Sequence, residues 1–185
     1  MTLHRFCCPD MAPASDRVRI EGAAAAQIRT VLRLRPGDQV VIFGADEWEY
    51  RVELESVGRG AASGTVVGRQ APAAEPRCQL TLVLALLKGE KTEWVLQKGT
   101  ELGVGRFVLV QTQRTIAVPD QQQQAGRRER YARIIREATE QCGRACPPSV
   151  EGVLAFSQAV AEHGKGPAFL LHERATERFL SLIHI

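Results

Sequence analysis

The sequence has no run of about 18 apolar residues, the length that a helix needs to cross a bilayer. Its first eight residues carry charge but lack the apolar stretch of a secretory signal. These two absences argue against a membrane protein and against secretion, so we expect a cytoplasmic protein. The 185 residues, 44% of them hydrophobic, suffice for one ordinary domain or for a small domain beside a larger one.

Cysteine and histidine are too few and too scattered to predict a metal site. The five cysteines are odd in number, which does not suit a disulfide framework. Cys142 and Cys146 stand four residues apart rather than in a CxxC pair, and no histidine lies at ligand spacing. We therefore expect neither a bound metal nor a set of disulfides.

Lysine is also scarce, at four of the 24 Lys and Arg positions, and the formal net charge is only +3. Such a small surplus identifies no partner. Arginine stays charged and forms paired hydrogen bonds with phosphate oxygens, so the arginine bias suits RNA contact. A GC-rich genome would produce the same bias, and composition does not choose between these explanations.

Residues 1–70 are typical of a small β-barrel. Short apolar or alternating segments predict several strands, and an alanine-rich segment at 22–32 predicts a short helix. The strands are expected at 17–20, 39–43, 48–57 and 64–69. The prolines and alanines of residues 71–76 predict a linker.

Residues 77–185 show a different pattern, in which continuous apolar runs alternate with helical segments. Buried strands are expected at 80–87, 107–110 and 169–171, and helices at 90–102, 126–142 and 156–163. This alternation predicts an α/β domain with a mostly parallel sheet.

Common catalytic signatures are absent: there is no GxGxxG after a strand, no P-loop, no GxSxG and no HExxH. Polar residues instead follow each expected strand of the second half, at 88–91, 111–114 and 172–174. Ligands of open α/β sheets bind outside the carboxyl ends of the strands, so these groups predict a site at one edge. The simpler interpretation is that every α/β domain has polar loops there.

Two helices carry acidic residues in unusual places. Glu93, Gln97 and Glu101 share one face of the helix at 90–102, beside Lys98, where surface ion pairs are the simplest explanation. Glu140 lies near the end of the next helix and opposes its dipole, which suggests a partner for this side chain.

Residues 87–104, with the sequence LKGEKTEWVLQKGTELGV, closely resemble the signature of the RsmE family of 16S ribosomal RNA (uracil-N3)-methyltransferases. Three further segments agree with that family in order and spacing: TQRT at 112–115, EATEQCGR at 137–144, and VLR at 31–33 followed by PGD at 36–38. The resemblance covers nearly the whole chain.

This resemblance implies a PUA-like RNA-binding β-barrel (residues 1–70) and a SPOUT-type α/β methyltransferase domain (residues 77–185) whose chain threads a trefoil knot. It implies a homodimer that binds S-adenosyl-L-methionine and methylates uracil N3 of one uridine in 16S rRNA of the small ribosomal subunit. It identifies no general base. It assigns signature or pocket positions to Lys88, Glu93, Lys98, Glu101, Glu140 and Gln141, cofactor contacts to Leu170, Leu171, His172 and Glu173, and RNA contacts to Arg5, Arg33, Arg35, Arg114 and Arg144.

The chain departs from the family at several places. Gln113 replaces the usual glutamate, Gly99 the usual alanine, and Gln27–Thr30 a segment that usually includes histidine. The family's Gly-Pro-Glu-Gly-Gly loop and its last conserved segment have no match, and residues 179–185 match nothing expected. We therefore expect an incomplete knot and no methyl transfer by this chain alone. The alternatives are a non-catalytic module that binds RNA and dimerises, and an unrelated nucleotide-binding α/β enzyme.

Overall fold

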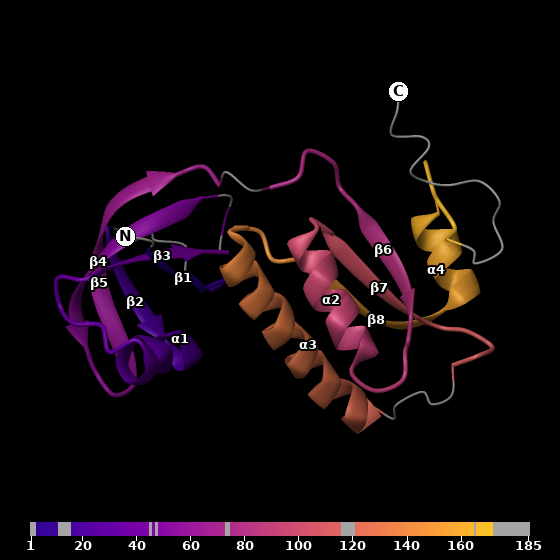
Figure 1. Ribbon diagram of the computed structural model, residues 1–185, viewed down its shortest axis with the longest axis horizontal. Coiled ribbons are helices and arrows are strands. Elements are labelled where there is room, and N and C mark those ends of the chain that lie inside the picture. The colour runs from indigo at the N-terminus through magenta and orange to yellow at the C-terminus, as the bar shows by residue number, and fades with distance from the viewer. Residues whose placement is uncertain are drawn as a thin grey trace.

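The computed structural model describes residues 3–10, 16–44, 46, 48–72, 75–115, 121–164 and 166–171. A lobe built on a five-stranded sheet lies beside a lobe built on a three-stranded sheet, and helix α3 lies between the two sheets (Figure 1). Within the described residues, no helix is both long and apolar enough to cross a membrane.

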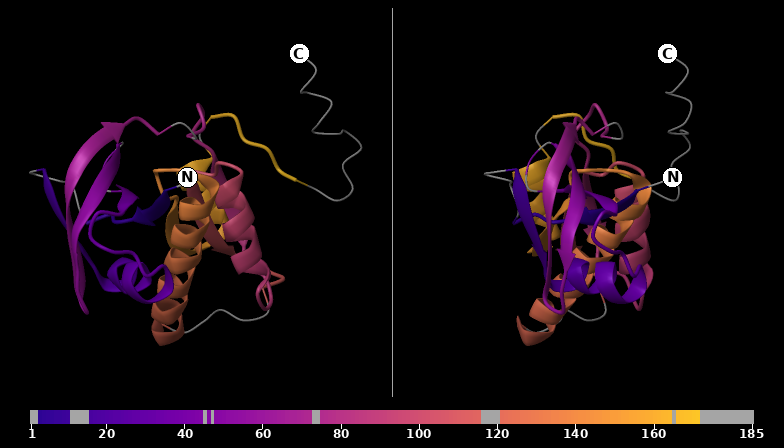
Figure 2. Two further views of the ribbon diagram at one scale, coloured as in Figure 1. Left: turned by 60° about the vertical axis from the view of Figure 1, so that its left-hand side comes forward. Right: turned by 90° about the vertical axis from the view of Figure 1, so that its left-hand side faces the viewer.

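The first lobe, called the β lobe below, contains a curled sheet in the order β1-β3-β4-β5-β2 (Figure 2). Strand β1 pairs with β3 in parallel and the other pairs are antiparallel. A short helix α1 (Gly22–Ala26) runs into a π-helical turn (Gln27–Val31) and packs near β2 and β5. The strands are β1 (His4–Cys7), β2 (Arg17–Glu21), β3 (Gln39–Phe43), β4 (Glu49–Val57) and β5 (Ala61–Gln70).

Alternation in β4 builds the core of this lobe, as predicted. Val52 and Leu54 are fully buried, while Arg51 before them and Glu53 between them are exposed. Glu49 is the exception, because the pattern placed it with the polar residues and the structure buries it to 3% exposure. A carboxylate is buried at this cost only with partners, and Glu49 has two, described below.

The second lobe, called the α/β lobe, has three parallel strands in the order β6-β7-β8. Phe107 and Leu109 of β7 pack against α2 and α3, whereas Val108 and Val110 point to the opposite face, against α4. The elements are β6 (Thr81–Ala85), α2 (Lys91–Glu101), β7 (Arg106–Gln111), α3 (Gln121–Cys142), β8 (Ser149–Ala155) and α4 (Phe156–His163). The predicted helices are therefore confirmed, with α3 starting five residues earlier.

Two strand predictions were wrong. The third strand is β8 rather than residues 169–171, whose side chains are at least 67% exposed and form no strand. Strand β6 was expected to be covered on both faces, but it lies at the sheet edge and leaves Val83 36% exposed. An apolar run becomes a buried strand only where a neighbouring strand and a covering helix are both present.

Candidate functional site

The carboxyl ends of the three parallel strands lie along one edge of the α/β lobe, as the sequence predicts. Ala85 of β6 is paired with Val110 of β7, and Gln111 of β7 with Ala155 of β8. The loops that follow these strands therefore leave the sheet together. A hollow of about 500 Å³ opens there, and its lining residues are Gln111, Thr112, Gln113, Arg114, Phe156 and Ser157. We call it the edge hollow.

A tight turn after β7 presents Arg114 to this hollow. The Thr112 N–H donates to Thr115 Oγ1 at 2.9 Å, and the Thr115 N–H donates to Thr112 O at 3.0 Å. These two bonds fix the turn and leave the Arg114 side chain exposed. On the far side, α4 starts at Phe156 and so places an aromatic ring and the Ser157 hydroxyl at the hollow. The lining thus combines a cation, hydroxyls, amides and one aromatic ring.

Lys88 follows β6 at the same edge and is exposed. Its loop is held by Thr92, whose hydroxyl oxygen accepts the Leu87 N–H at 3.1 Å. Lys88 and Arg114 thus follow neighbouring strands, as predicted. The third predicted group, His172 and Glu173, lies outside the described residues. Leu170 and Leu171, which precede it, are each 79% exposed.

The charged face of α2 pairs with protein groups rather than with the hollow. Glu93 accepts a hydrogen bond from Arg130 of α3 at 2.7 Å, and Lys98 pairs with Glu101 at 2.8 Å. Because α2 leaves the carboxyl edge at Lys91 and runs 11 residues back along the sheet, Lys98 and Glu101 lie away from the hollow. The simple interpretation as ion pairs therefore describes these contacts.

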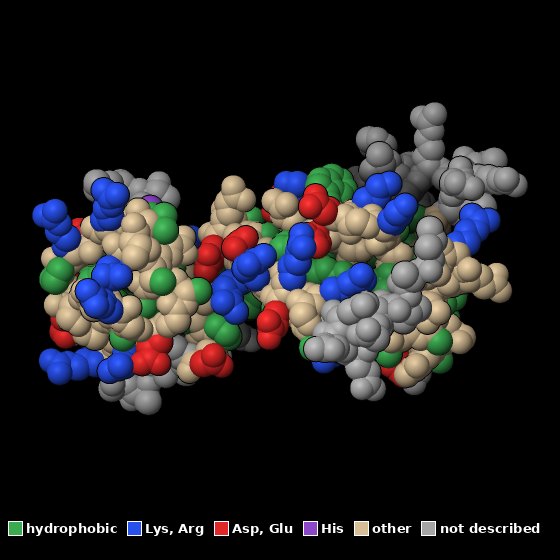
Figure 3. Space-filling view, turned by 90° about the horizontal axis from the view of Figure 1, so that it is seen from below, with side chains coloured by type: hydrophobic (Ala, Val, Ile, Leu, Met, Phe, Trp, Pro, Cys, Tyr) green, Lys and Arg blue, Asp and Glu red, His purple; other side chains and the backbone are tan. Residues whose placement is uncertain are grey.

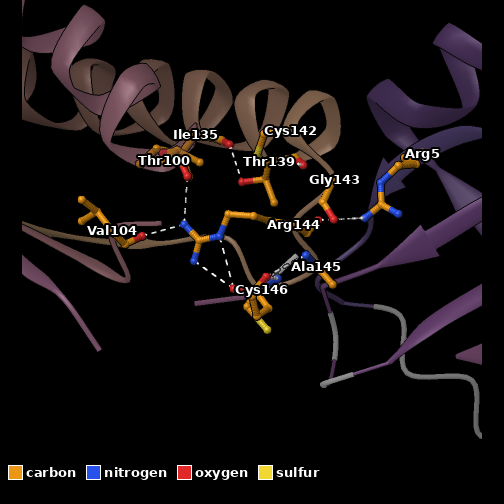
Figure 4. A network of polar contacts seen from close by, with 11 residues as sticks. Arg5, Thr100, Val104, Ile135, Thr139, Cys142, Gly143, Arg144, Ala145 and Cys146 are labelled. Carbon is orange, nitrogen blue, oxygen red and sulfur yellow. Dashed lines mark hydrogen bonds and ion pairs between the residues drawn. The ribbon is translucent and has the colours of Figure 1, made fainter. Parts of the chain in front are cut away.

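Arg144, which follows the end of α3, is almost completely buried (Figure 4). Its Nη1 donates to the carbonyl oxygens of Thr100 at 3.0 Å and Val104 at 2.7 Å. Its Nε and Nη2 donate to one carboxylate oxygen of Glu75, at 3.2 and 3.1 Å. The other oxygen accepts the N–H groups of Ala145 and Cys146, both at 2.8 Å. Every nitrogen of this guanidinium serves the fold, so we do not retain Arg144 as an RNA contact.

Arg5 connects the two lobes from the opposite side. Its Nη2 donates to Glu49 Oε1 at 2.9 Å and to the carbonyl oxygens of Gly143 and Arg144, at 3.2 and 2.8 Å. Its guanidinium also lies over the Phe43 ring, 4.8 Å from the centroid. Arg5 is therefore engaged inside the protein, whereas the other predicted RNA contacts, Arg33, Arg35 and Arg114, are exposed.

Glu140 has a partner, as its unusual position near the end of the helix suggested. Its Oε1 accepts the Cys7 N–H at 2.8 Å, which ties the end of α3 to β1. Burial raises the pKa of the Glu140 carboxyl above its usual value, although the Cys7 N–H and Arg136 lower it in part. Gln141 beside it is exposed. The signature residues thus separate into Lys88 at the carboxyl edge of the sheet and Glu140 at the contact between the lobes.

The two adjacent cysteines of this contact do not supply a nucleophile. Burial raises the pKa of Cys7 to about 11 and that of Cys8 to about 12, so both thiols stay protonated at neutral pH. No group of three or more histidine, cysteine, aspartate or glutamate side chains in the described part of the chain could hold a metal ion.

Replacing Glu140 by glutamine should stabilise the protein increasingly as the pH rises from about 4 to 7. The folded protein binds this proton more readily than the unfolded one, because the folded pKa lies above the ordinary value of 4.5. The wild-type free energy of unfolding therefore falls as the pH rises through the raised pKa, and Glu140→Gln removes that loss while still accepting the Cys7 N–H. Urea unfolding at several pH values measures the difference in free energy of unfolding between Glu140→Gln and wild type. Glu129→Gln, at an exposed position of the same helix, is the control. A difference between Glu140→Gln and wild type that stays the same at every pH would contradict the prediction.

Comparison with known proteins decides the lineage of this site. Residues 74–184 match the family model described as RNA methyltransferase domain. The chain belongs to this family. It is 34% identical over 139 residues to the Bacillus subtilis protein named ribosomal RNA small subunit methyltransferase E, which covers 75% of this chain and 54% of that protein. A Mycobacterium bovis protein of the same name is 33% identical over 169 residues, covering 88% and 64%. The resemblance noted from the sequence is thereby confirmed.

Solved structures agree with the arrangement of both lobes. A putative methyltransferase from Legionella pneumophila, determined with bound SAM, superposes with a TM-score of 0.89 at 25% identity over 98% of this chain and 75% of that one. A ribosomal RNA small subunit methyltransferase E from Neisseria gonorrhoeae gives a TM-score of 0.81 at 24% identity and supports the same mixed α/β fold. The chain spans about half to two thirds of the length of the curated relatives described here.

Proposed function

We propose that the protein acts in S-adenosyl-L-methionine-dependent methylation of uracil N3 of a uridine in 16S rRNA. The family match supports methyl transfer to RNA, and the edge hollow is the observation that gives this chemistry a place. In the same proposal the β lobe is a PUA-like RNA-binding barrel, the α/β lobe is the SPOUT-type part, and the enzyme works as a cytoplasmic homodimer. The relatives' printed names support small-subunit rRNA as the substrate.

The edge hollow fits part of a methyl donor of this class. Its volume of about 500 Å³ lies within the range of roughly 300–1,000 Å³ that small-molecule sites occupy. Phe156 offers an apolar surface, and Thr112, Gln113 and Ser157 offer hydrogen-bonding groups to a polar ligand. Leu170, Leu171, His172 and Glu173 stay proposed contacts of the methyl donor, on the family resemblance of their segment. S-Adenosyl-L-methionine would supply the activated methyl group.

The protein's own task is to make uracil N3 reactive. That nitrogen carries a proton whose pKa lies well above neutral, so attack on a methyl group needs the proton removed or the developing negative charge stabilised. Arg114 lines the edge hollow and supplies positive charge there, and Lys88 follows the adjacent strand at the same edge of the sheet. The target base has to leave its stack to reach such a site.

RNA contact is supported by exposed basic side chains on both lobes. Figure 3 shows Lys and Arg side chains over the β lobe and over the helices on one face of the molecule. Arg33, Arg35 and Arg114 are the predicted contacts that remain exposed. Contacts of this kind to phosphate weaken as salt is added.

Because the chain spans only part of its relatives, the whole reaction is best tested in a chimaera. Residues 1–171 are joined to the C-terminal remainder of the Bacillus subtilis relative and incubated with labelled S-adenosyl-L-methionine and unmethylated small ribosomal subunits. The expected product is 3-methyluridine in 16S rRNA, reduced about 100-fold or more by Arg114→Glu. A folded chimaera that binds the methyl donor but labels no RNA would refute the proposal.

A further inference from the structure

A second hollow lies on the β lobe, away from the strand ends of the α/β lobe. It measures about 160 Å³, and its apolar lining comes from Leu3, Val41 and Val67. Arg51, Arg69 and Gln70 also border it. We call it the β-lobe hollow. At that size it is smaller than the roughly 300–1,000 Å³ of a site for a whole cofactor, and it suits a single planar ring.

The register of the sheet explains why a ring has room there. Arg51 of β4 is flanked by Val41 of β3 and Gly68 of β5 on one face of the sheet. Gly68 has no side chain, and a Cβ built on it would meet no atom within 4 Å. The open space above Gly68 therefore continues into the hollow, with Val41 as its buried apolar wall.

The rim of the hollow carries positive charge. Arg51 is exposed, and no ion pair joins it to another described residue. Arg69 is paired with Tyr50 and so points to the other face of the sheet, where its guanidinium lies 4.8 Å from the centroid of the Trp48 ring. An exposed cation beside an apolar slot suits a base of single-stranded nucleic acid and its adjoining phosphate.

The charge of the hollow's wall selects a base rather than a phosphate. Glu49 lines it, and both of its carboxylate oxygens are occupied, one by Arg5 at 2.9 Å and one by Gln70 Nε2 at 3.0 Å. A phosphate placed deep in the hollow would meet this carboxylate, whereas an uncharged ring would not. The phosphates adjoining the ring would remain at the rim, where Arg51 is exposed.

We propose that the β-lobe hollow binds one unstacked base of single-stranded RNA while Arg51 holds an adjoining phosphate. This inference rests on the proposed function, because it gives the RNA a second, residue-specific contact besides the edge hollow. Through Glu49 the hollow is connected to Arg5, which contacts the carbonyl groups of residues 143 and 144. A base bound here lies beside the contact between the two lobes.

The test uses fluorescein-labelled decauridylate and a ten-base-pair RNA duplex as probes, with fluorescence anisotropy over a range of salt. Wild type should bind the single strand more tightly than the duplex, because a paired base cannot enter the hollow. Gly68→Leu should fill the open space and weaken single-strand binding about tenfold, with an unchanged salt dependence. Arg51→Ala should also weaken it and lower the slope of log K against log salt by about 0.7.

Arg59→Ala is the matched control, because Arg59 is exposed in the turn of the same β4–β5 hairpin, about 25 Å from Arg51 along the strand. It should bind within about twofold of wild type. Circular dichroism verifies that each variant is folded. The proposal that the hollow binds RNA would be overturned by wild-type affinity in folded Gly68→Leu, or by equal losses of affinity in Arg51→Ala and Arg59→Ala. In either case methylation by the chimaera would leave the proposed function standing, whereas its absence would count against that function separately.

Discussion

Replacing Arg144 by alanine should lower the free energy of unfolding by about 3–5 kcal/mol. The substitution leaves the Glu75 carboxylate without its cation, removes the donor to the Val104 carbonyl oxygen, and removes one of the two donors to the Thr100 carbonyl oxygen, which keeps the Gly103 N–H. A buried charge or acceptor that loses its partner keeps its full desolvation cost. Urea unfolding followed by circular dichroism measures the loss.

A surface pair on the neighbouring helix provides the control for Arg144. Arg133 and Glu137 lie 4.0 Å apart with both side chains about two thirds exposed, so Arg133→Ala should change stability by less than about 0.5 kcal/mol. Arg144→Lys should fall between the two, because an ammonium group cannot reproduce the planar fork of donors. A loss below about 1 kcal/mol in Arg144→Ala would contradict the geometry described for this side chain.

Residues of the family signature have two different roles, and Arg144 illustrates the structural one. It stands in the segment 137–144, next to Glu140, and both side chains hold main-chain groups of other elements. Lys88 and Arg114 belong to other signature segments and are exposed near the strand ends. The same resemblance therefore includes residues that position the lobes and residues available to a ligand.

Strands with a strict pattern could be predicted from the sequence, and those without one could not. The alternation around Val52 and Leu54 and the apolar run 107–110 both became strands. Strand β8 was not predicted, because Glu151 and Gly152 interrupt its apolar residues. The triplet 169–171 is apolar, but a strand also needs a partner, and that is a property of the fold rather than of three residues.

The candidate site shows the same limit. The rule that ligands bind at the carboxyl edge of a parallel sheet located Lys88 and Arg114 correctly beside each other in the strand order. The partners of the charged residues were not predictable, because they are distant in sequence: Glu93 pairs with Arg130 across 37 positions, and Glu75 with Arg144 across 69. Gly99 shows a similar dependence, since a Cβ there would lie 2.7 Å from the buried Phe107 ring.

Replacing Arg5 by alanine should lower the free energy of unfolding by about 3 kcal/mol, because it leaves the buried carboxylate of Glu49 without its cation. It also removes the donor to the carbonyl groups of Gly143 and Arg144, so the contact between the lobes weakens. With Trp94 replaced by phenylalanine, so that fluorescence reports Trp48 of the β lobe, unfolding monitored by circular dichroism and by fluorescence should then give separate transitions where the same protein with Arg5 gives one. Coincident transitions and unchanged stability would contradict this role.

A double substitution tells the two consequences of losing Arg5 apart. Glu49→Gln removes the buried negative charge and keeps an acceptor for Gln70. Arg5→Ala combined with Glu49→Gln should therefore have a free energy of unfolding at least about 1 kcal/mol higher than Arg5→Ala alone. It should not restore a single transition, because the carbonyl groups of residues 143 and 144 still lack their donor. Decauridylate binding depends on the charge of Glu49 instead. In Arg5→Ala, RNA bound at the β-lobe hollow would lie beside a carboxylate without its cation, so binding should weaken. In the double variant that charge is absent, so binding should recover. Stability, lobe contact and RNA affinity thus respond differently to the same pair of side chains, which identifies Arg5 as the residue that links all three.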